Sequence, residues 1–400
     1  MAKQKSKSLF SYLKMPKHYD LAMHISVIAL MLFGTLMITS TSVGQTYFSD
    51  MVVLKTFLKQ FIFVVASYFA LTIMANWFTM GKAKGYAQFV GYLMLIVMLS
   101  CRFFDEVNGS YAWIRMPVPG LGEVTLQPSE FFKVFMVVIV AVTVEATRKK
   151  NYDWWTIVKV PVFFLAAGAF LLLFVQKDSG QLMSTLLICL ACAMIPSHPN
   201  LKKPQRIIAL MLMIGVPILL FIMSESGIHF LMNSGILKEY QVSRFIAAAD
   251  PTEDYLGYGY QLSTALYAFA RGGLKGVGLG ESGLKMMYLP EATTDYILPI
   301  IVEELGIFGF LFIVLLYGVI LYRLFYYAFK AKSEGYKVIL IGTAMYLSVH
   351  FLLNVGGVSG LIPLTGVPLL FISSGSSSLL SVCIAIGISQ AVISRIRTAS

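Results

Sequence analysis

Residues 296–322 have the sequence YILPIIVEELGIFGFLFIVLLYGVILY, an apolar run in which Glu303 and Glu304 are the only charged residues. An α-helix needs about 20 residues to cross the hydrocarbon core of a membrane, and this run is longer. Its apolar residues are continuous and do not alternate with polar ones, so it predicts a helix and not a strand of a membrane barrel. Further predominantly apolar runs lie at 22–42, 57–76, 84–101, 131–145, 157–175, 181–196, 206–224, 338–354 and 368–393. We therefore expect an all-α membrane protein, a polytopic bundle of about ten transmembrane helices.

The composition of the 400-residue chain fits this class, because 58% of it is hydrophobic, 13% is charged and the mean hydropathy is +0.76. A soluble protein of this length would need more charged surface. The formal net charge of +11 is explained by membrane orientation. If both termini lie inside, 20 of the 31 Lys and Arg residues but only 4 of the 20 acids fall on the inner side, as the positive-inside rule requires. We therefore predict a multi-pass protein with both termini in the cytoplasm, in contact with membrane lipid and with no nucleic-acid partner.

The whole chain, 1–400, is expected to form a single integral membrane domain with a basic cytoplasmic tail at 1–21. Most loops are short, but those at 102–130 and 225–295 are longer, and both lie outside in this topology. The segment 225–295 is predicted to be a large extracellular loop between helices 7 and 8, and a loop of this length is a candidate for function. Its run at 272–280 has the glycine density of a phosphate-binding loop, but no strand precedes it, which favours a tight or flexible turn.

Polar residues near the ends of the apolar runs gather in four clusters. A charged residue inside a span costs about 2.5–3.5 kcal/mol on insertion scales and usually serves a site or a partner. Taken alone, each cluster is also explained by a structural ion pair or a polar turn. Taken together, all four fall on the outer side of the predicted topology, which indicates a shared site. The clusters lie at 127–133, 176–180, 290–304 and 354–378.

At these clusters the chain resembles the SEDS family, the shape, elongation, division and sporulation proteins, of which FtsW and RodA are members. The resemblance keeps the order of the motifs over nearly the whole chain. The matching motifs are NGSYAWI at 108–114 with QPSEFFK at 127–133, QKDSG at 176–180, YLPEATTDYI at 288–297 with EELGIFG at 303–309, and NVGGVSGLIPLTGVPLLFISSGSSS at 354–378. The chain departs from the family pattern at Lys177, Thr293, Tyr296 and Ser376, where the family usually has proline, histidine, phenylalanine and glycine. None of these departures removes an acidic residue.

The resemblance implies a peptidoglycan glycosyltransferase on the outer face of the bacterial cytoplasmic membrane. Its substrate would be lipid II, the disaccharide pentapeptide carried on undecaprenyl pyrophosphate. Its partners would be a class B penicillin-binding protein and other proteins of the division or elongation complex. The Leu-Pro-Glu-Ala form of the third motif favours the FtsW branch over RodA. Two alternatives stay open, a lipid II flippase and a non-catalytic scaffold of the cell-wall synthesis complex. A flippase would need charged residues in the inner half of the spans, and a scaffold would tolerate the loss of Asp295.

Polymerisation of such a lipid needs a base for the acceptor hydroxyl and positive charge near the departing pyrophosphate. Asp295 is the candidate catalytic base, because it directly precedes the 296–322 run and therefore lies at the outer membrane boundary. Partial burial beside Glu291 would raise its pKa toward a range that is useful for a base. The alternative role for Asp295 is that of a helix N-cap, which aspartate favours.

Several further residues are expected to bind substrate or to support the site. Glu130 and Lys133 are three residues apart, so they share a helix face and can pair. Glu303 and Glu304 lie roughly 12–14 Å along the helix from Asp295, which favours a polar network over a share in the chemistry. The full set of substrate-binding or supporting candidates is Glu130, Lys133, Asp178, Arg244, Lys285, Glu291 and Ser373, with Arg271 and Lys275 as further basic candidates.

The sequence requires no cofactor and predicts no protein-bound structural metal. The five histidines are scattered and lack metal-ligand spacing. Cys189 and Cys192 form a C-x-x-C, but it lies inside a predicted span, which favours a packing role for these small residues. A divalent cation, Mg or Mn, would help the pyrophosphate to leave.

Overall fold

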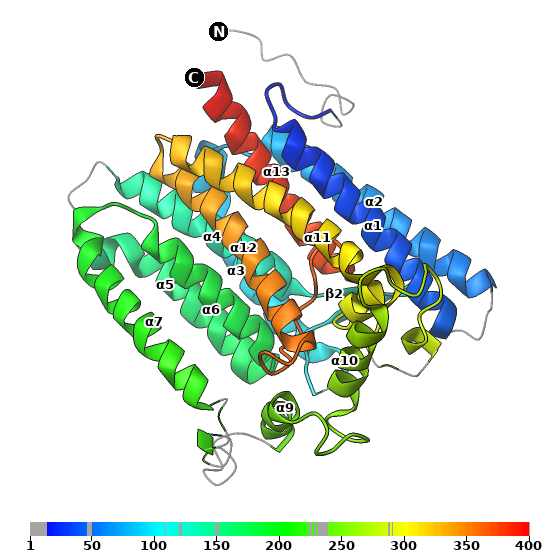
Figure 1. The fold of residues 1–400 in the computed structure, drawn as a ribbon. Coiled ribbons are helices and arrows are strands. Elements are labelled where there is room, and N and C mark those ends of the chain that lie inside the picture. Colours follow the sequence, from blue (N-terminus) through cyan, green and yellow to red (C-terminus); the bar gives the residue numbers. More distant parts are fainter. Residues whose placement is uncertain are drawn as a thin grey trace.

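The computed structural model describes residues 14–45, 50–107, 109–119, 122–148, 152–222, 224, 226–227, 230, 239–286, 289 and 291–399. These residues form a bundle of long helices that run side by side (Figure 1). The C-terminal end of the last helix, α13 (Ser376–Ala399), lies at the opposite end of the bundle from α9 (Glu239–Ala249) and α10 (Tyr260–Gly272) (Figure 1). Residues 1–13 of the predicted basic tail lie outside the described residues, as does part of the predicted loop at 225–295.

The longer helices are α1 (Leu21–Gln45), α2 (Asp50–Trp77), α3 (Met80–Ser100), α4 (Pro128–Thr147), α5 (Trp154–Phe170), α6 (Ser179–Met194), α7 (Lys202–Ile222), α11 (Ile297–Lys330), α12 (Glu334–Val358) and α13 (Ser376–Ala399). A π-helical turn, Leu171–Val175, extends α5, and α9 (Glu239–Ala249) and α10 (Tyr260–Gly272) belong to the long loop. At the centre of the bundle α13 packs against α2 and α4, and α12 packs against α4, α6 and α11. Helix α7 lies at the periphery (Figure 1).

Each predicted apolar run coincides with a helix of the structure, although several boundaries differ from the prediction. Eight helices of the described chain are long and apolar enough to cross a membrane. Helix α6 is shorter, and α4 contains three charged residues, although both coincide with predicted runs. The run predicted at 368–393 is not one helix, because α13 begins only at Ser376 and residues 363–375 have no regular secondary structure. Prolines at 363 and 368 favour extended backbone around this stretch and delay the helix start.

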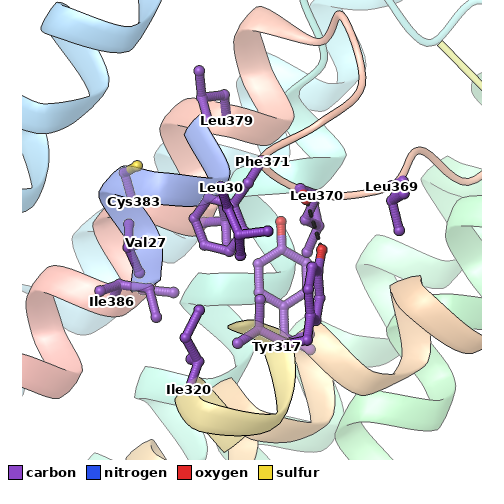
Figure 2. Close-up of a cluster of buried hydrophobic side chains, with 14 of the residues drawn as sticks. Val27, Leu30, Tyr317, Ile320, Leu369, Leu370, Phe371, Leu379, Cys383 and Ile386 are labelled. Atoms are coloured by element: carbon purple, nitrogen blue, oxygen red, sulfur yellow. Dashed lines mark hydrogen bonds between the residues drawn. The ribbon is translucent and has the colours of Figure 1, made fainter. Parts of the chain in front are cut away.

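The stretch before α13 is buried although it is not helical. Residues 367–373 are at most 3% exposed, apart from the half-buried Pro368. Tyr317 of α11 donates a hydrogen bond from its hydroxyl to the Leu370 carbonyl at 2.6 Å, which satisfies a backbone group that water cannot reach. Gly34 of α1 allows the close approach of the segment, because a Cβ there would lie 2.4 Å from the Phe371 carbonyl oxygen. Figure 2 shows the surrounding apolar cluster, to which α1, α11 and α13 all contribute.

Helix α11 is broken at Gly306, where the backbone adopts φ 65° and ψ −164°. The glycine-rich run after α10 packs into this break. Val277 N–H donates to the Glu303 carbonyl at 2.9 Å, and Ile307 N–H donates to the Gly273 carbonyl at 3.0 Å. A side chain at Gly306 would lie 2.3 Å from the Leu274 carbonyl oxygen, so the contact requires glycine. The run at 272–280 is therefore a tight turn that attaches the long loop to α11.

A short antiparallel hairpin lies between α3 and α4, where the sequence analysis expects only a loop. Strand β1 (Ile114–Val118) pairs with β2 (Gly122–Leu126), with Met116 opposite Val124. The hairpin leads directly into α4, and Ser376 at the start of α13 donates from its hydroxyl to the Thr125 carbonyl at 2.6 Å. It thereby fixes the relative positions of two helices that border the candidate site.

Candidate functional site

The four polar clusters predicted from the sequence meet at one end of the bundle. Gln127 donates from its amide side chain to Asp178 Oδ2 at 3.2 Å, which joins the first cluster to the second. Its backbone N–H donates to Ser377 Oγ at 2.8 Å and so joins the first to the fourth. Asn354 of the fourth cluster donates from Nδ2 to the Asp295 carbonyl at 2.9 Å. The predicted convergence of these segments is therefore confirmed.

Asp295 lies in the turn that leads into α11 and is half-buried. Its backbone is fixed by Asn354 from one side, and on the other Ser373 donates from its hydroxyl to the carbonyl of the preceding Thr294 at 2.7 Å. The predicted support by Ser373 is thus a contact with the backbone that carries Asp295. Gly366, with φ 69°, faces the carboxylate, because a Cβ there would lie 3.6 Å from Asp295 Oδ2.

The carboxylate of Asp295 differs from the other buried carboxylates in that it is not engaged. Among the described residues, no side chain or backbone group donates a hydrogen bond to it. The cap position of α11 is Tyr296, and no side chain caps this helix. The alternative role of Asp295 as a helix cap is therefore not what the geometry supports.

Burial raises the pKa of Asp295 to about 7, and the negative charge of Glu291 acts in the same direction. The charge of Asp178 also raises this pKa, whereas the guanidinium of Arg244 lowers it. Glu291 adopts φ 58° and accepts a hydrogen bond from the Thr294 hydroxyl at 2.6 Å, which fixes the turn around Asp295. Near neutral pH the carboxylate is thus able both to take up and to release a proton.

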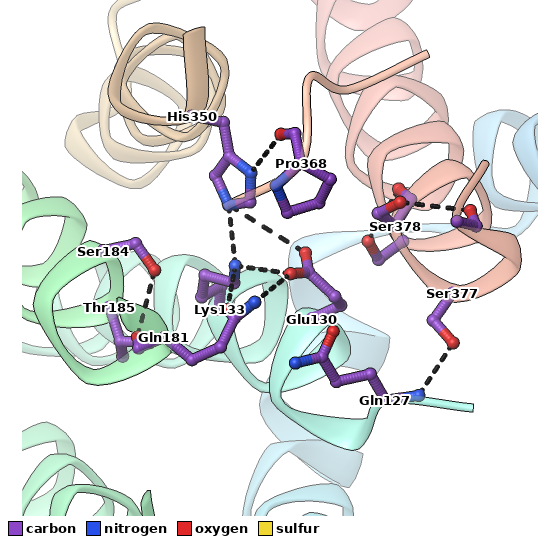
Figure 3. Close-up of polar contacts among 12 residues, drawn as sticks. Gln127, Glu130, Lys133, Gln181, Ser184, Thr185, His350, Pro368, Ser377 and Ser378 are labelled. Carbon is purple, nitrogen blue, oxygen red and sulfur yellow. Dashed lines mark hydrogen bonds and ion pairs between the residues drawn. The ribbon is translucent and has the colours of Figure 1, made fainter. Parts of the chain in front are cut away.

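Glu130 and Lys133 form the predicted ion pair, at 2.9 Å, and both side chains are fully buried. The ammonium also donates to Gln181 Oε1 at 2.6 Å and contacts His350 Nε2 at 2.7 Å. Glu130 in turn accepts from Gln181 Nε2 at 2.9 Å (Figure 3). It also accepts from the Tyr346 hydroxyl at 2.8 Å. A buried ion pair is tolerated only when its remaining donors and acceptors are satisfied, and this network supplies the necessary partners.

Asp178 lies at the N-terminus of α6, between the buried network and Asp295. It accepts a hydrogen bond from the backbone N–H of Gln181 at 3.0 Å and so caps α6. Burial raises the pKa of Asp178, and the capping bond and the charge of Lys133 oppose this rise. The neighbouring Gly180 packs closely on the fourth cluster, because a Cβ there would lie 2.1 Å from the Thr365 carbonyl oxygen.

The basic candidates have different surroundings. Lys285 is 2% exposed and pairs with Glu304 at 3.1 Å, and Arg271 pairs with Glu303 at 2.6 Å. Both pairs belong to the polar network that the sequence analysis assigned to the two glutamates. Arg244 is exposed, and it is the candidate whose charge acts on Asp295. Its Nη1 donates to the Leu364 carbonyl at 2.9 Å, so α9 is attached to the segment that follows α12.

A cavity of about 370 Å³ opens between α9, α10 and the end of α12, and Asp295 itself is not among the residues that line it. Tyr296, the residue after Asp295, forms part of its wall together with Arg244, Tyr260 and Gly357. The volume lies within the range of pockets that enclose small ligands. Its lining combines tyrosine rings with one guanidinium, which suits a ligand with both sugar-like and anionic parts.

No group of three or more His, Cys, Asp and Glu residues suited to a metal occurs in the part of the chain that the structure describes. The oxygens around Asp295 nevertheless fit a hard divalent cation, which prefers carboxylate, amide and hydroxyl ligands. Two buried oxygens of the fourth cluster, Asn354 Oδ1 and Thr365 Oγ1, have no hydrogen-bond partner among the described residues. The charges of Asp178 and Asp295 repel each other, which a cation would relieve.

The sequence analysis did not identify His350, Tyr346 and Gln181 as parts of the site. All three lie inside apolar runs and are at most 2% exposed. Their polarity within predicted spans was a usable signal, since such residues usually face a partner or a site. Tyr346 and His350 are also four residues apart, which places them on the same face of α12.

Comparisons with known proteins agree on one family. The family model FTSW_RODA_SPOVE, described as "Cell cycle protein", matches residues 20–398. The chain is 32% identical over 379 residues to the probable peptidoglycan glycosyltransferase FtsW of Bacillus subtilis (strain 168), which covers 94% of this chain and 90% of that one. It is 31% identical over 377 residues to the stage V sporulation protein E of the same organism, which covers 92% of this chain and 95% of that one.

Two solved structures have a similar fold. One is a chain from "Structural coordination of polymerization and crosslinking by a peptidoglycan synthase complex", with a TM-score of 0.70 and 21% identity over 96% of this chain and 100% of that one. The other is the rod shape determining protein RodA of Thermus thermophilus, with a TM-score of 0.61 and 18% identity over 94% of this chain and 97% of that one. At these identities the likeness establishes the fold.

Proposed function

The chain belongs to the FtsW/RodA/SpoVE family of cell cycle proteins, and from this premise we infer that it is a peptidoglycan glycosyltransferase of cell-wall synthesis and cell division. Its multi-pass membrane fold agrees with a substrate that is carried on a lipid. We assign lipid II as that substrate, with polymerisation on the outer face of the membrane and both termini in the cytoplasm. The excess of Lys and Arg on the predicted inner side supports this orientation.

The observation that carries the mechanism is the carboxylate of Asp295, which accepts no hydrogen bond from the described residues and directly precedes Tyr296 in the cavity wall. In the reaction, the hydroxyl oxygen of the acceptor sugar bonds to the anomeric carbon of the donor. The bond from that carbon to the pyrophosphate breaks, and the lipid pyrophosphate leaves with the bonding electrons. Asp295 takes the proton of the attacking hydroxyl, for which a pKa of about 7 is well suited.

Positive charge for the departing pyrophosphate comes from Arg244 in this assignment. Arg244 lines the cavity, and its charge acts on Asp295, so positive charge lies near the proposed base. Guanidinium groups bind phosphate oxygens through two parallel hydrogen bonds. Lys285 and Lys133 are committed to buried carboxylates, and their role is to hold the fold around the site.

A divalent cation, Mg²⁺ or Mn²⁺, fits the same region. Asp178 and two oxygens that lack a partner among the described residues, Asn354 Oδ1 and Thr365 Oγ1, would hold it, which leaves Asp295 available as the base. When bound, such an ion would stabilise the negative charge that develops on the pyrophosphate.

The distribution of charge supports a polymerase over a flippase. A flippase must carry a charged headgroup through the whole thickness of the membrane. The helices around the buried network have no charged residue over 134–144 in α4, over 305–322 in α11 and over 338–349 in α12. The buried ionisable residues of the network and of Asp295 instead lie near one end of these helices, where a lipid-linked sugar would reach them.

We assign a class B penicillin-binding protein as the partner, together with other proteins of the division or elongation complex. The support is that a chain with this fold occurs in a peptidoglycan synthase complex of polymerisation and crosslinking. A polymerase that releases uncrosslinked strands needs a crosslinking enzyme close by.

The test is polymerisation of fluorescent lipid II by the purified full-length protein in lipid nanodiscs, with and without such a partner. The wild type should produce a ladder of glycan strands, and Asp295→Asn should lower the rate about 10²–10⁴-fold, as loss of a general base does. Glu253→Gln, on an exposed loop that precedes α10, is the matched control and should retain the wild-type rate. Lipid II transfer between leaflets without any polymer would favour the flippase and overturn this assignment.

A further inference from the structure

His350 is a fully buried imidazole in the middle of the network, with groups of opposite character at its two ring nitrogens. Its Nε2 lies 2.7 Å from Lys133 Nζ and 4.0 Å from Glu130 Oε2. Its Nδ1 lies 3.3 Å from the Pro368 carbonyl oxygen (Figure 3). Its ring packs edge-on against Tyr346 of the same helix, with 4.9 Å between the ring centroids.

These neighbours determine which nitrogen carries the proton. An ammonium can only donate, so Nε2 of His350 must accept from Lys133. A carbonyl oxygen can only accept, so Nδ1 must carry the hydrogen that is donated to Pro368. The imidazole is therefore neutral, and it completes the hydrogen bonds of Lys133, whose other two protons go to Glu130 and Gln181.

Pro368, which His350 contacts through its Nδ1, belongs to the buried segment that faces Asp295. Pro368 follows Gly366 by two residues, and Gly366 lies against the Asp295 carboxylate. The intervening Val367 is held by Asn354, which donates to its carbonyl at 3.0 Å and to the Asp295 carbonyl at 2.9 Å. A displacement of Pro368 would therefore move the wall of the site next to the reacting carboxylate.

We propose that His350 is a positioning residue for the glycosyltransferase reaction, a neutral imidazole that ties the Lys133–Glu130 ion pair to the Pro368 carbonyl and so holds the 365–368 segment against Asp295. The inference rests on the proposed function, because its readout is the rate of polymerisation. It assigns to His350 no contact with substrate.

The chemistry of the two contacts identifies a variant that should preserve the function. A glutamine at 350 offers an amide oxygen as acceptor for Lys133 and an amide N–H as donor for Pro368. A leucine has a similar size and neither group, so it leaves a lysine proton and a carbonyl without partners. His350→Gln is expected to stay within about threefold of the wild-type rate, and His350→Leu to lose tenfold or more in kcat with little change in KM for lipid II.

A matched control separates positioning from mere loss of stability. His24→Leu also removes a buried imidazole, on α1 but outside the network. It should leave kcat unchanged, whereas the kcat that His350→Leu loses should be retained in His350→Gln.

A second measurement tests the protonation of His350 in the wild-type protein and does not use His350→Leu. In ¹⁵N-histidine spectra of the wild-type protein, the signal that disappears in His350→Gln should report protonated Nδ1 and bare Nε2 throughout pH 6–8. The proposal is overturned if that signal titrates, if His350→Gln is folded but slow, or if His350→Leu polymerises lipid II at the wild-type rate. If the wild type does not polymerise lipid II at all, the proposed function fails, while the spectra still test the tautomer.

Discussion

The raised pKa of Asp295 makes a quantitative prediction for the pH dependence of polymerisation. A base acts only when it is ionised, and with a pKa of about 7 the carboxylate fraction is about 10% at pH 6 and about 90% at pH 8. The rate of lipid II polymerisation should therefore rise about tenfold between these pH values. An ordinary aspartate, with a pKa near 3.9, would already be fully ionised at pH 6 and would give a flat profile.

The same carboxyl group should oppose folding at high pH. Its pKa is higher in the folded protein than in the unfolded chain, so the folded state binds the proton more tightly. Stability is then unaffected below pH 4 and falls as the pH rises from about 4 to about 7. A difference of about three pH units corresponds to about 4 kcal/mol at most, and partial exposure of the side chain reduces the expected cost to about 1–3 kcal/mol.

Asp295→Asn should consequently be inactive and yet more stable than the wild type at pH 8, with no difference at pH 4. The assay is thermal unfolding in the same detergent at both pH values, combined with the gel assay of glycan strands. Glu253→Gln serves as the control for loss of one carboxylate from an exposed position. A flat rate profile between pH 6 and 8, or an Asp295→Asn variant that is less stable at pH 8, would refute the reasoning from burial.

Three further predictions follow from single contacts. Glu130→Ala leaves the ammonium of Lys133 buried without its carboxylate and should lower the free energy of unfolding by about 3–5 kcal/mol. A thermal-shift assay would detect this change. An unchanged unfolding temperature would mean that water enters the network and replaces the carboxylate. Gly306→Ala forces a Cβ to 2.3 Å from the Leu274 carbonyl oxygen at a positive φ. It should lower the free energy of unfolding by about 1–3 kcal/mol or more and expose the 272–280 turn to proteolysis. Gly318→Ala, which has open space around the Cβ, should do neither. To test the orientation, Glu253→Cys should react with an impermeant maleimide from outside, and Lys332→Cys should react only after the membrane is opened. The native cysteines are all buried and should not add to the labelling. The reverse pattern would mean that the topology is inverted.

The membrane helices and the meeting of the polar clusters were predictable because each depends on a local signal. Continuous apolar runs specify spans whatever their partners are. The spacing of Glu130 and Lys133 alone predicts their contact, which is observed at 2.9 Å. The position of Asp295 before the α11 run likewise placed it at a helix start near other polar residues.

The features that escaped the sequence depend on contacts between distant segments. Hydropathy cannot distinguish a buried extended segment from a helix, so residues 368–375 were assigned to a span although the chain is not helical there. The break at Gly306 exists because the run at 272–280 supplies backbone partners to α11 from another part of the chain. The burial of Lys285 required knowledge that Glu304 faces it. None of these partners can be identified from the spacing of residues within one segment.

Comparison of the acidic residues near the site indicates why Asp295 is the reactive one. Glu303 accepts hydrogen bonds from Arg271, Ser282 and two backbone N–H groups, and Glu130 is as completely satisfied. These two carboxylates therefore serve as fixed acceptors that hold neighbouring elements together. A carboxylate that must exchange a proton with a substrate needs to be accessible to it. Among the described residues, no group donates a hydrogen bond to the Asp295 carboxylate, which is the arrangement that a general base requires.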